Sequence, residues 1–283
     1  MNILLALLPA IGWGIQPLIL TKIGGKPVNQ IVGTGIGALL VAVIVQVGFS
    51  PPPISRTVFF ISLASGAFWV IGQAGQYHSL KIIGVAKTMP ITTGLQLVGT
   101  SLISVIAFKE WPGIQNKLFG LGAIILLIVG ATLTATTDNK SANQSLKKGV
   151  LILVSTSIGY WIYSALPRIV DASGLAIFFP QMLGVFIGAV VYALKQSPKT
   201  LITKKSWETS IIGLTFSLSA LAYIFSAQAN GVATAFIISQ LSVVVSTLGS
   251  LVILKEKKTT HELTYTLIGL ALIVVGSTIT VFI

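Results

Sequence analysis

The stretch GVAKTMPITTGLQLVGTSLISVIAFKE at residues 84–110 recurs later in the chain as GVATAFIISQLSVVVSTLGSLVILKE at residues 231–256. Each copy is an apolar run that begins at a Gly-Val-Ala triplet and ends at a Lys-Glu pair. Each is long enough to cross the hydrocarbon core of a bilayer, which takes about 20 residues of helix. The two copies therefore predict membrane-spanning helices and, because they share one pattern, an internal repeat.

The composition of the whole chain excludes a soluble protein. Of its 283 residues, 54% are hydrophobic and 8% are charged, whereas soluble domains carry about 25% charged residues. The net charge of +12 does not indicate a nucleic-acid partner, because the basic residues lie at the ends of apolar runs, where they set membrane orientation. With no cysteine, two histidines and six acids, the chain is not expected to be an enzyme or to hold a metal or cofactor.

Charged residues divide the chain into membrane spans, because a charge at the bilayer centre is costly. The uncharged intervals are 1–21, 27–55, 57–80, 88–108, 118–137, 149–167, 172–194, 209–254 and 263–283. The interval 209–254 is long enough for two spans, and Ala229-Asn230-Gly231 is a natural break inside it. The sequence therefore predicts an all-α polytopic membrane protein with ten transmembrane helices.

The repeat extends beyond the two quoted stretches. At an offset of 147 residues, Gly84 matches Gly231, and Ile11-Gly12-Trp13 matches Ile158-Gly159-Tyr160. At an offset of 146, Lys109 matches Lys255 and Gly130 matches Gly276. At an offset of 151, Gln30, Gly33 and Gly37 match Gln181, Gly184 and Gly188. The chain is predicted to comprise a five-helix repeat at 1–137, a linker at 138–146 and a second repeat at 147–283. Because five is odd, the second repeat enters the membrane from the opposite side, which is an inverted-topology repeat.

The basic residues predict the orientation of the ten spans. Four lie on the side of the termini: Arg56, Lys109, Lys117 and Arg168. Fourteen lie on the other side: Lys22, Lys26, Lys81, Lys87, Lys140, Lys147, Lys148, Lys195, Lys199, Lys204, Lys205, Lys255, Lys257 and Lys258. The positive-inside rule then places both termini outside the cell.

The predicted spans contain neutral amides beside aromatic rings and no Asp or Glu, which disfavours a cationic substrate. A Gln side chain offers a donor and an acceptor to sugar hydroxyls, and a flat indole packs on the C–H face of a sugar ring. The candidate substrate-binding residues, on spans 1, 3, 4, 6, 7 and 9, are Trp13, Gln16, Trp69, Gln73, Gln96, Trp161, Gln181 and Gln240. The structural alternative for a single Gln is a bond to a neighbouring helix, worth about 0.6 kcal/mol.

Several segments resemble the glucose/ribose porter family of the drug/metabolite transporter superfamily. They are Gly24-Gly25-Lys26-Pro27-Val28-Asn29-Gln30-Ile31, Ala86-Lys87-Thr88-Met89-Pro90-Ile91-Thr92-Thr93, Trp111-Pro112-Gly113 and Phe179-Pro180-Gln181. The resemblance runs over essentially the whole chain, including the plan of ten spans. It implies uptake of glucose or ribose at the bacterial plasma membrane, coupled to protons, but it supplies no binding residue of its own.

The sequence therefore favours a monosaccharide uptake permease that works by alternating access, with a small neutral sugar as its partner and lipid around it. Glucose and ribose remain alternatives because both present the same chemistry to Gln and Trp. The energy source is the proton gradient, with His78 as the candidate coupling group, or the sugar gradient itself. The rival functions are a drug or metabolite exporter of the same superfamily and a membrane scaffold without transport, which a closed apolar interior would favour.

Overall fold

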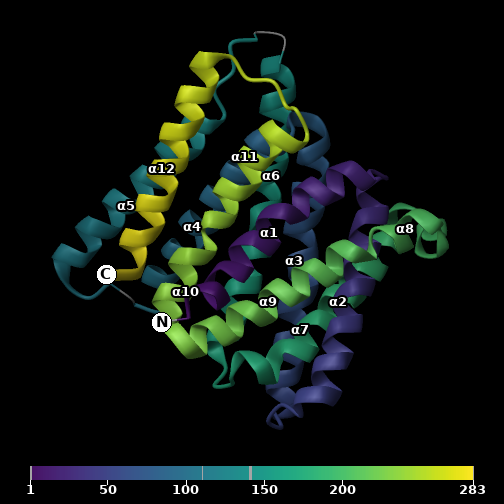
Figure 1. Cartoon of the computed structure of the whole chain (residues 1–283). Coiled ribbons are helices and arrows are strands. Elements are labelled where there is room, and N and C mark those ends of the chain that lie inside the picture. Colours follow the sequence, from purple (N-terminus) through teal and green to yellow (C-terminus); the bar gives the residue numbers. More distant parts are fainter. Residues whose placement is uncertain (1, 110, 140–141, 283) are drawn as a thin grey trace.

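Helices make up the regular secondary structure of this computed structural model, which describes residues 2–109, 111–139 and 142–282 (Figure 1). Within those ranges there is no strand. The first half holds α1 (Ile3–Ile23), α2 (Pro27–Phe49), α3 (Arg56–Ile83), α4 (Val85–Ala107) and α5 (Gly113–Thr134). The second half holds α6 (Ala142–Ala165), η1 (Leu166–Ile169), α7 (Gly174–Gln196), η2 (Pro198–Ile202), α8 (Lys204–Glu208), α9 (Ser210–Asn230), α10 (Val232–Ser239), α11 (Leu241–Ile253) and α12 (Thr260–Phe282).

Ten helical segments among the described residues are long and apolar enough to cross a membrane, which confirms the predicted all-α, ten-span architecture. Three of these segments combine shorter helices: α6 with η1, α8 with α9, and α10 with α11. The predicted break inside the long interval is confirmed, because α9 ends at Asn230 and α10 begins at Val232. A second break, at Gln240, divides the ninth span into α10 and α11.

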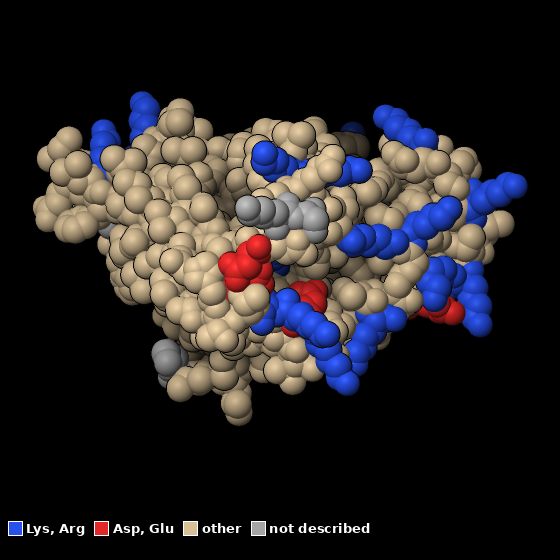
Figure 2. All heavy atoms as spheres, turned by 90° about the horizontal axis from the view of Figure 1, so that it is seen from above, with Lys and Arg blue, Asp and Glu red and all other residues tan. Residues whose placement is uncertain are grey.

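Consecutive spans run in opposite directions, so the connections lie on two faces (Figure 1). We call one side the basic face: it carries the connections α1–α2, α3–α4, α5–α6, α7–α8 and α11–α12, with most of the lysines. The terminal face carries both termini and the connections α2–α3, α4–α5, α6–α7 and α9–α10. Figure 2 shows lysine and arginine side chains projecting from the upper surface of the molecule, with fewer acidic residues among them.

Glycines allow two pairs of spans to cross closely. A Cβ added at Gly37 of α2 would lie 2.1 Å from the Ser210 carbonyl oxygen of α9. A Cβ added at Gly184 of α7 would lie 2.0 Å from the Leu63 carbonyl oxygen of α3. The two crossings are related by one offset of 147 residues. The sequence alignment of Gly37 with Gly188 at an offset of 151 is therefore wrong at this crossing, where Gly184 occupies the position equivalent to Gly37.

The two Lys-Glu pairs begin at residues with the same unusual backbone. Lys109 and Lys255 have φ of 55° and 56°, and they follow the ends of α4 and α11 on the terminal and the basic face respectively. Glu110 lies outside the described residues, so the predicted placement of the first pair is only partly described. The inverted repeat itself stays a prediction.

Candidate functional site

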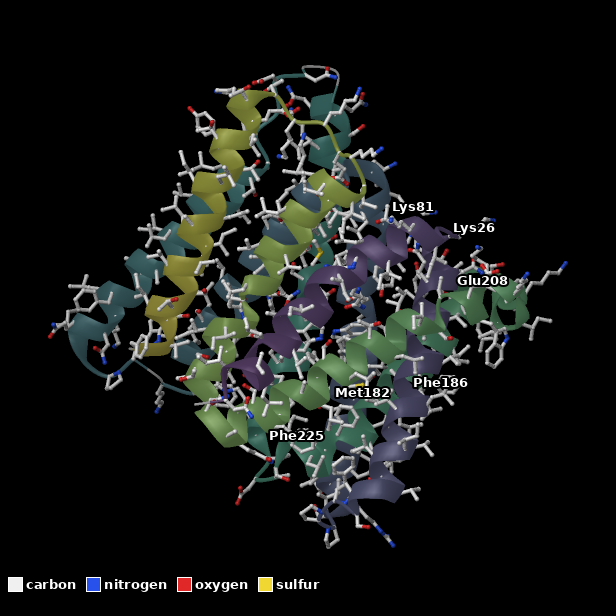
Figure 3. All side chains as sticks on the ribbon, viewed as in Figure 1. Lys26, Lys81, Met182, Phe186, Glu208 and Phe225 are labelled. Atoms are coloured by element: carbon white, nitrogen blue, oxygen red, sulfur yellow. The ribbon has the colours of Figure 1, made fainter. Side chains whose placement is uncertain are left out.

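A cavity of about 440 Å³ lies in the middle of the bundle. This volume is within the range of small-molecule sites, about 300–1,000 Å³. It is lined by residues of the first, third, fourth, sixth, seventh and ninth spans, the spans on which the candidate residues lie, and also by α9 of the eighth span. Figure 3 shows one lining residue, Met182, in the interior of the molecule, between Lys26 and Lys81 toward the basic face and Phe225 toward the terminal face.

The cavity reaches the terminal face and stops short of the basic face. Its lining includes Pro167 of η1 and Gly174, the first residue of α7, which both lie at the terminal-face ends of their spans. In the other direction the lining ends at Gln16 and Gln76, each seven residues before its helix ends at the basic face, and at Met89, four residues after α4 begins there. Because four to seven residues of helix rise about 6–10 Å, one to two turns of helix separate the cavity from the basic face and close that side.

The structure gathers seven of the eight candidate substrate-binding residues around this cavity: Trp13, Gln16, Trp69, Gln73, Gln96, Gln181 and Gln240. Trp161 is not among the lining residues. Its indole Nε1 donates a hydrogen bond to the Leu95 carbonyl oxygen at 2.9 Å, and its ring fills the space beside Gly99. Trp161 therefore packs α6 against α4. His78 is also outside the lining, with its Nδ1 2.8 Å from the Ala74 carbonyl oxygen.

One tyrosine organises the amides of α3. The hydroxyl oxygen of Tyr160 lies 2.7 Å from Oε1 of Gln73 and 2.7 Å from Oε1 of Gln76. The two glutamines are three residues apart on one helix and therefore share a face. The Tyr160 hydroxyl has one hydrogen and donates to one of these oxygens at a time, so the other oxygen can accept from a ligand. Amide N–H groups of both residues can donate to a ligand, although Nε2 of Gln76 also lies 2.9 Å from the Met89 sulfur.

Two more glutamines are held by hydroxyl groups outside the cavity lining. Nε2 of Gln16 donates to the buried Tyr77 hydroxyl at 3.4 Å, and that hydroxyl lies 2.9 Å from Thr34 Oγ1. Nε2 of Gln181 donates to Ser65 Oγ at 3.2 Å. In both residues the amide nitrogen is engaged, which leaves the carbonyl oxygen to accept a hydrogen bond from a ligand.

Aromatic rings form the remaining walls. Trp69 packs on Phe216 with ring centroids 4.5 Å apart, and Trp13 packs on Tyr223 at 5.9 Å. Among the described residues, no hydrogen bond to the hydroxyl of Tyr163 or of Tyr223 is present, and both residues line the cavity. These two hydroxyls can therefore donate to a ligand at the terminal-face side of the cavity.

The lining residues occupy equivalent positions in the two halves. Five in the first half are Trp13, Gln16, Trp69, Gln73 and Gln76, and the residues 147 positions later, Tyr160, Tyr163, Phe216, Ala220 and Tyr223, line the cavity too. The first set supplies three amides, and the second supplies three tyrosines, of which Tyr163 and Tyr223 lie toward the terminal face. Phe216 and Tyr223 were missed from the sequence, although adding the repeat offset to Trp69 and Gln76 would have identified them.

The cavity is electrically neutral. None of its lining residues among the described part of the chain is Asp, Glu, Lys, Arg or His. The described residues also contain no cluster of three His, Cys, Asp or Glu side chains that could hold a metal ion. The arrangement suits an uncharged ligand with several hydroxyl groups and one flat apolar face.

Comparisons with known proteins agree on one family for this chain. The profile of the family described as "Sugar transport protein" matches residues 4–283. A Lactobacillus helveticus protein named "Putative sugar uptake protein" is 46% identical over 281 residues, covering 99% of this chain and 100% of the relative. A Staphylococcus epidermidis protein named "Putative ribose uptake protein RbsU" is 44% identical, covering 99% of this chain and 98% of the relative. A crystal structure with 14% sequence identity shares the fold, with a TM-score of 0.65 over 98% of this chain and 96% of that one.

Proposed function

This chain belongs to the sugar transport protein family, and from that premise we propose that it is a permease that carries a neutral monosaccharide across the plasma membrane into the cell. Its ten apolar spans make it a multi-pass membrane protein. The relatives named for sugar or ribose uptake match it over nearly their whole length. Uptake, rather than export of drugs or metabolites, is therefore the proposed direction.

The observation that carries the proposal is the uncharged, amide-lined cavity at the centre of the bundle. A scaffold without transport activity needs no such space, and cationic cargo needs a carboxylate that the described lining does not have. Polar side chains at this depth are costly unless they face a partner or a cavity. Glutamines that face a cavity are satisfied when hydroxyl groups of a sugar replace water there.

The contacts within the cavity suggest how a sugar is oriented. N–H groups of Gln73 and Gln76 would donate to sugar oxygens, while the carbonyl oxygens of Gln16 and Gln181 would accept from sugar hydroxyls. The face of Trp69 or Trp13 would pack on the C–H groups of the ring. Ribose and glucose both offer these groups, and the Staphylococcus relative makes ribose the first sugar to test.

Alternating access would follow from the two halves. We place the basic face in the cytoplasm, so that the cavity as described opens to the outside. The matched crossings of α2 with α9 and of α7 with α3, at one offset of 147 residues, support the two five-helix units at 1–137 and 147–283 as an inverted repeat. Rocking of these units around the central cavity would then expose the sugar to each side in turn.

The driving force would be either the sugar gradient or a proton that binds outside the cavity. Since the described lining has no Asp, Glu, Lys, Arg or His, His78 on α3 remains the candidate for proton coupling. Uptake in the presence of a protonophore distinguishes the two driving forces, because only proton-coupled uptake is abolished. If a protonophore abolishes uptake by the wild-type protein while His78→Gln transports normally, the assignment to His78 is wrong.

A sugar panel tests the proposal directly. The gene is expressed in a host that lacks its own sugar permeases, and uptake of labelled ribose, glucose and other neutral sugars is followed beside a charged sugar phosphate. The proposal predicts uptake of at least one neutral monosaccharide and none of the phosphate. Export from preloaded cells without any uptake would instead support the exporter.

A further inference from the structure

A carboxylate of the second half binds the first half at the basic face. Glu256 lies in the connection between α11 and α12. Its Oε1 accepts a hydrogen bond from the Val85 backbone N–H at 2.7 Å, and its Oε2 accepts one from Ala86 at 2.9 Å. These N–H groups belong to the first turn of α4, where no helical carbonyl is available to them and where the helix dipole favours a negative charge.

This contact lies at the basic-face ends of α4 and α11, two helices that line the central cavity. Met89, the lining residue of α4 nearest the basic face, is one turn further along the same helix. On the partner side, Ser242 of α11 lines the cavity, and the same helix ends two residues before Lys255. For a ligand to leave through the basic face, these ends of α4 and α11 have to separate, and the Glu256 contact joins them.

The equivalent helix start on the open side is exposed. Val232 of α10 is the counterpart of Val85 at an offset of 147 residues, and both follow a glycine with positive φ. Val85 is 0% exposed, whereas Val232 is 67% exposed. Glu110, the counterpart of Glu256 at an offset of 146 residues, lies outside the described residues. The covered helix start therefore lies on the closed face and the uncovered one on the open face.

We propose that Glu256 is a latch: its carboxylate holds the basic face of the cavity closed in this conformation, and its release from Val85 and Ala86 accompanies opening toward that face. The latch rests on the proposed function in one respect, namely that the opening it controls is a step of sugar transport. The contacts themselves do not depend on that function.

The surroundings allow the latch to open without stranding a charge. Glu256 lines a second, smaller cavity of about 230 Å³ at the basic face, together with Lys87, Lys257 and Lys258. A carboxylate that leaves the helix start would lie in this cavity, with three ammonium groups at its border. The carboxylate is therefore stabilised both at the helix start and in this cavity, as an element with two stable states requires.

Gly84 gives the latch a matched pair of test variants. Its φ is 77°, and an added Cβ would lie 2.8 Å from Oε1 of Glu256. Gly231 has a φ of 84°, but an added Cβ there meets nothing within 4 Å. Gly84→Ala and Gly231→Ala therefore impose the same kind of backbone strain, while only Gly84→Ala displaces the carboxylate.

Cysteine labelling measures the position of the latch, because the natural chain has no cysteine. A single Ala220→Cys places a thiol on the cavity wall. Sealed right-side-out and inside-out vesicles are treated with a membrane-impermeant maleimide, and Lys199→Cys and Ser50→Cys identify the basic and the terminal face. In the otherwise unchanged protein, the cavity thiol should react from the terminal face and only slowly from the basic face.

Opening the latch should reverse this preference. We expect Glu256→Gln and Gly84→Ala each to raise labelling from the basic face by about tenfold, the result of losing charge-assisted hydrogen bonds from one of two states. Gly231→Ala and Glu208→Gln, the latter removing a carboxylate paired with Lys205 on the same face, should leave the rate unchanged.

Equal labelling rates in all four variants, with each protein eluting as a single species in size-exclusion chromatography, would show that Glu256 only caps a helix. Should Glu256→Gln fail to fold, the comparison of Gly84→Ala with Gly231→Ala decides the question. Labelling requires no sugar, so the latch and the proposed sugar transport can fail independently.

Discussion

Gln73 and Gln76 are the residues whose chemistry most directly connects the structure to a sugar. We expect Gln73→Ala to weaken sugar affinity by up to about tenfold, because one good hydrogen bond is worth about 0.5–1.5 kcal/mol. The measurement is a binding isotherm on purified protein. Gln30→Ala is the matched control: Gln30 is buried and donates to the Gly24 carbonyl oxygen, outside the cavity. Gln30→Ala should lower the yield of folded protein and leave sugar affinity unchanged. A loss of affinity in Gln30→Ala but not in Gln73→Ala would contradict the assignment of Gln73 to the sugar site.

Lys258 gives a prediction at alkaline pH. Burial, together with the Lys87 ammonium, lowers the pKa of Lys258 from 10.5 to about 8. Between these two values the unfolded chain binds more protons than the folded one, so the free energy of unfolding should rise with pH in that window. We expect the free energy of unfolding to rise by about 1 kcal/mol. This figure already allows for solvent screening, because the side chain is partly exposed.

The measurement for Lys258 is thermal unfolding in detergent at pH 7.5, 8.5 and 9.5, with Lys258→Gln as the reference that removes the titrating group. The difference between wild-type and variant stability should shrink or reverse in favour of the wild type as the pH rises. A difference that does not depend on pH would show that the ammonium is not held in a partly dehydrated place.

At the scale of elements, the close crossing of α3 and α7 depends on Gly66 and Gly184. An added Cβ at Gly66 would lie 1.8 Å from the Gln181 carbonyl oxygen, so we expect Gly66→Ala to force the helices apart and to lower the folded yield strongly. Gly122 of α5 is the control, because an added Cβ there meets nothing within 4 Å. Gly122→Ala should be neutral or slightly stabilising in fluorescence-detected size-exclusion chromatography. Equal yields for both variants would contradict the described crossing.

The spans could be predicted from the sequence because each charge marks a place where the chain leaves the membrane. Asn230-Gly231 likewise marked the break between α9 and α10. Which side of its helix a residue occupies was less predictable. Trp161 was selected for its depth in the span, but its ring faces α4 and Gly99 instead of the cavity. Contacts between distant elements, such as Glu256 with the start of α4, leave no local signal, because they depend on how the two halves pack.

For the whole molecule, the orientation in the membrane is a prediction of its own. With the basic face in the cytoplasm, both termini lie outside, since ten spans return the chain to its starting side. A reporter fused to the C-terminus that is active only in the periplasmic or external compartment would agree with this. A second fusion in the connection near Lys199, on the basic face, should give the opposite readout. Cytoplasmic activity of the C-terminal reporter would contradict the orientation.

The central claim is that the amide-lined cavity is the site through which a neutral sugar is taken up. Its most direct measurement is the uptake of labelled ribose and glucose into proteoliposomes that contain the purified wild-type protein or the Gln73→Ala, Gln76→Ala double variant. We predict saturable uptake of one of these sugars by the wild type and at least a tenfold loss of apparent affinity in the variant. No uptake of either sugar by folded wild-type protein, or uptake that the double variant leaves unchanged, would contradict the account.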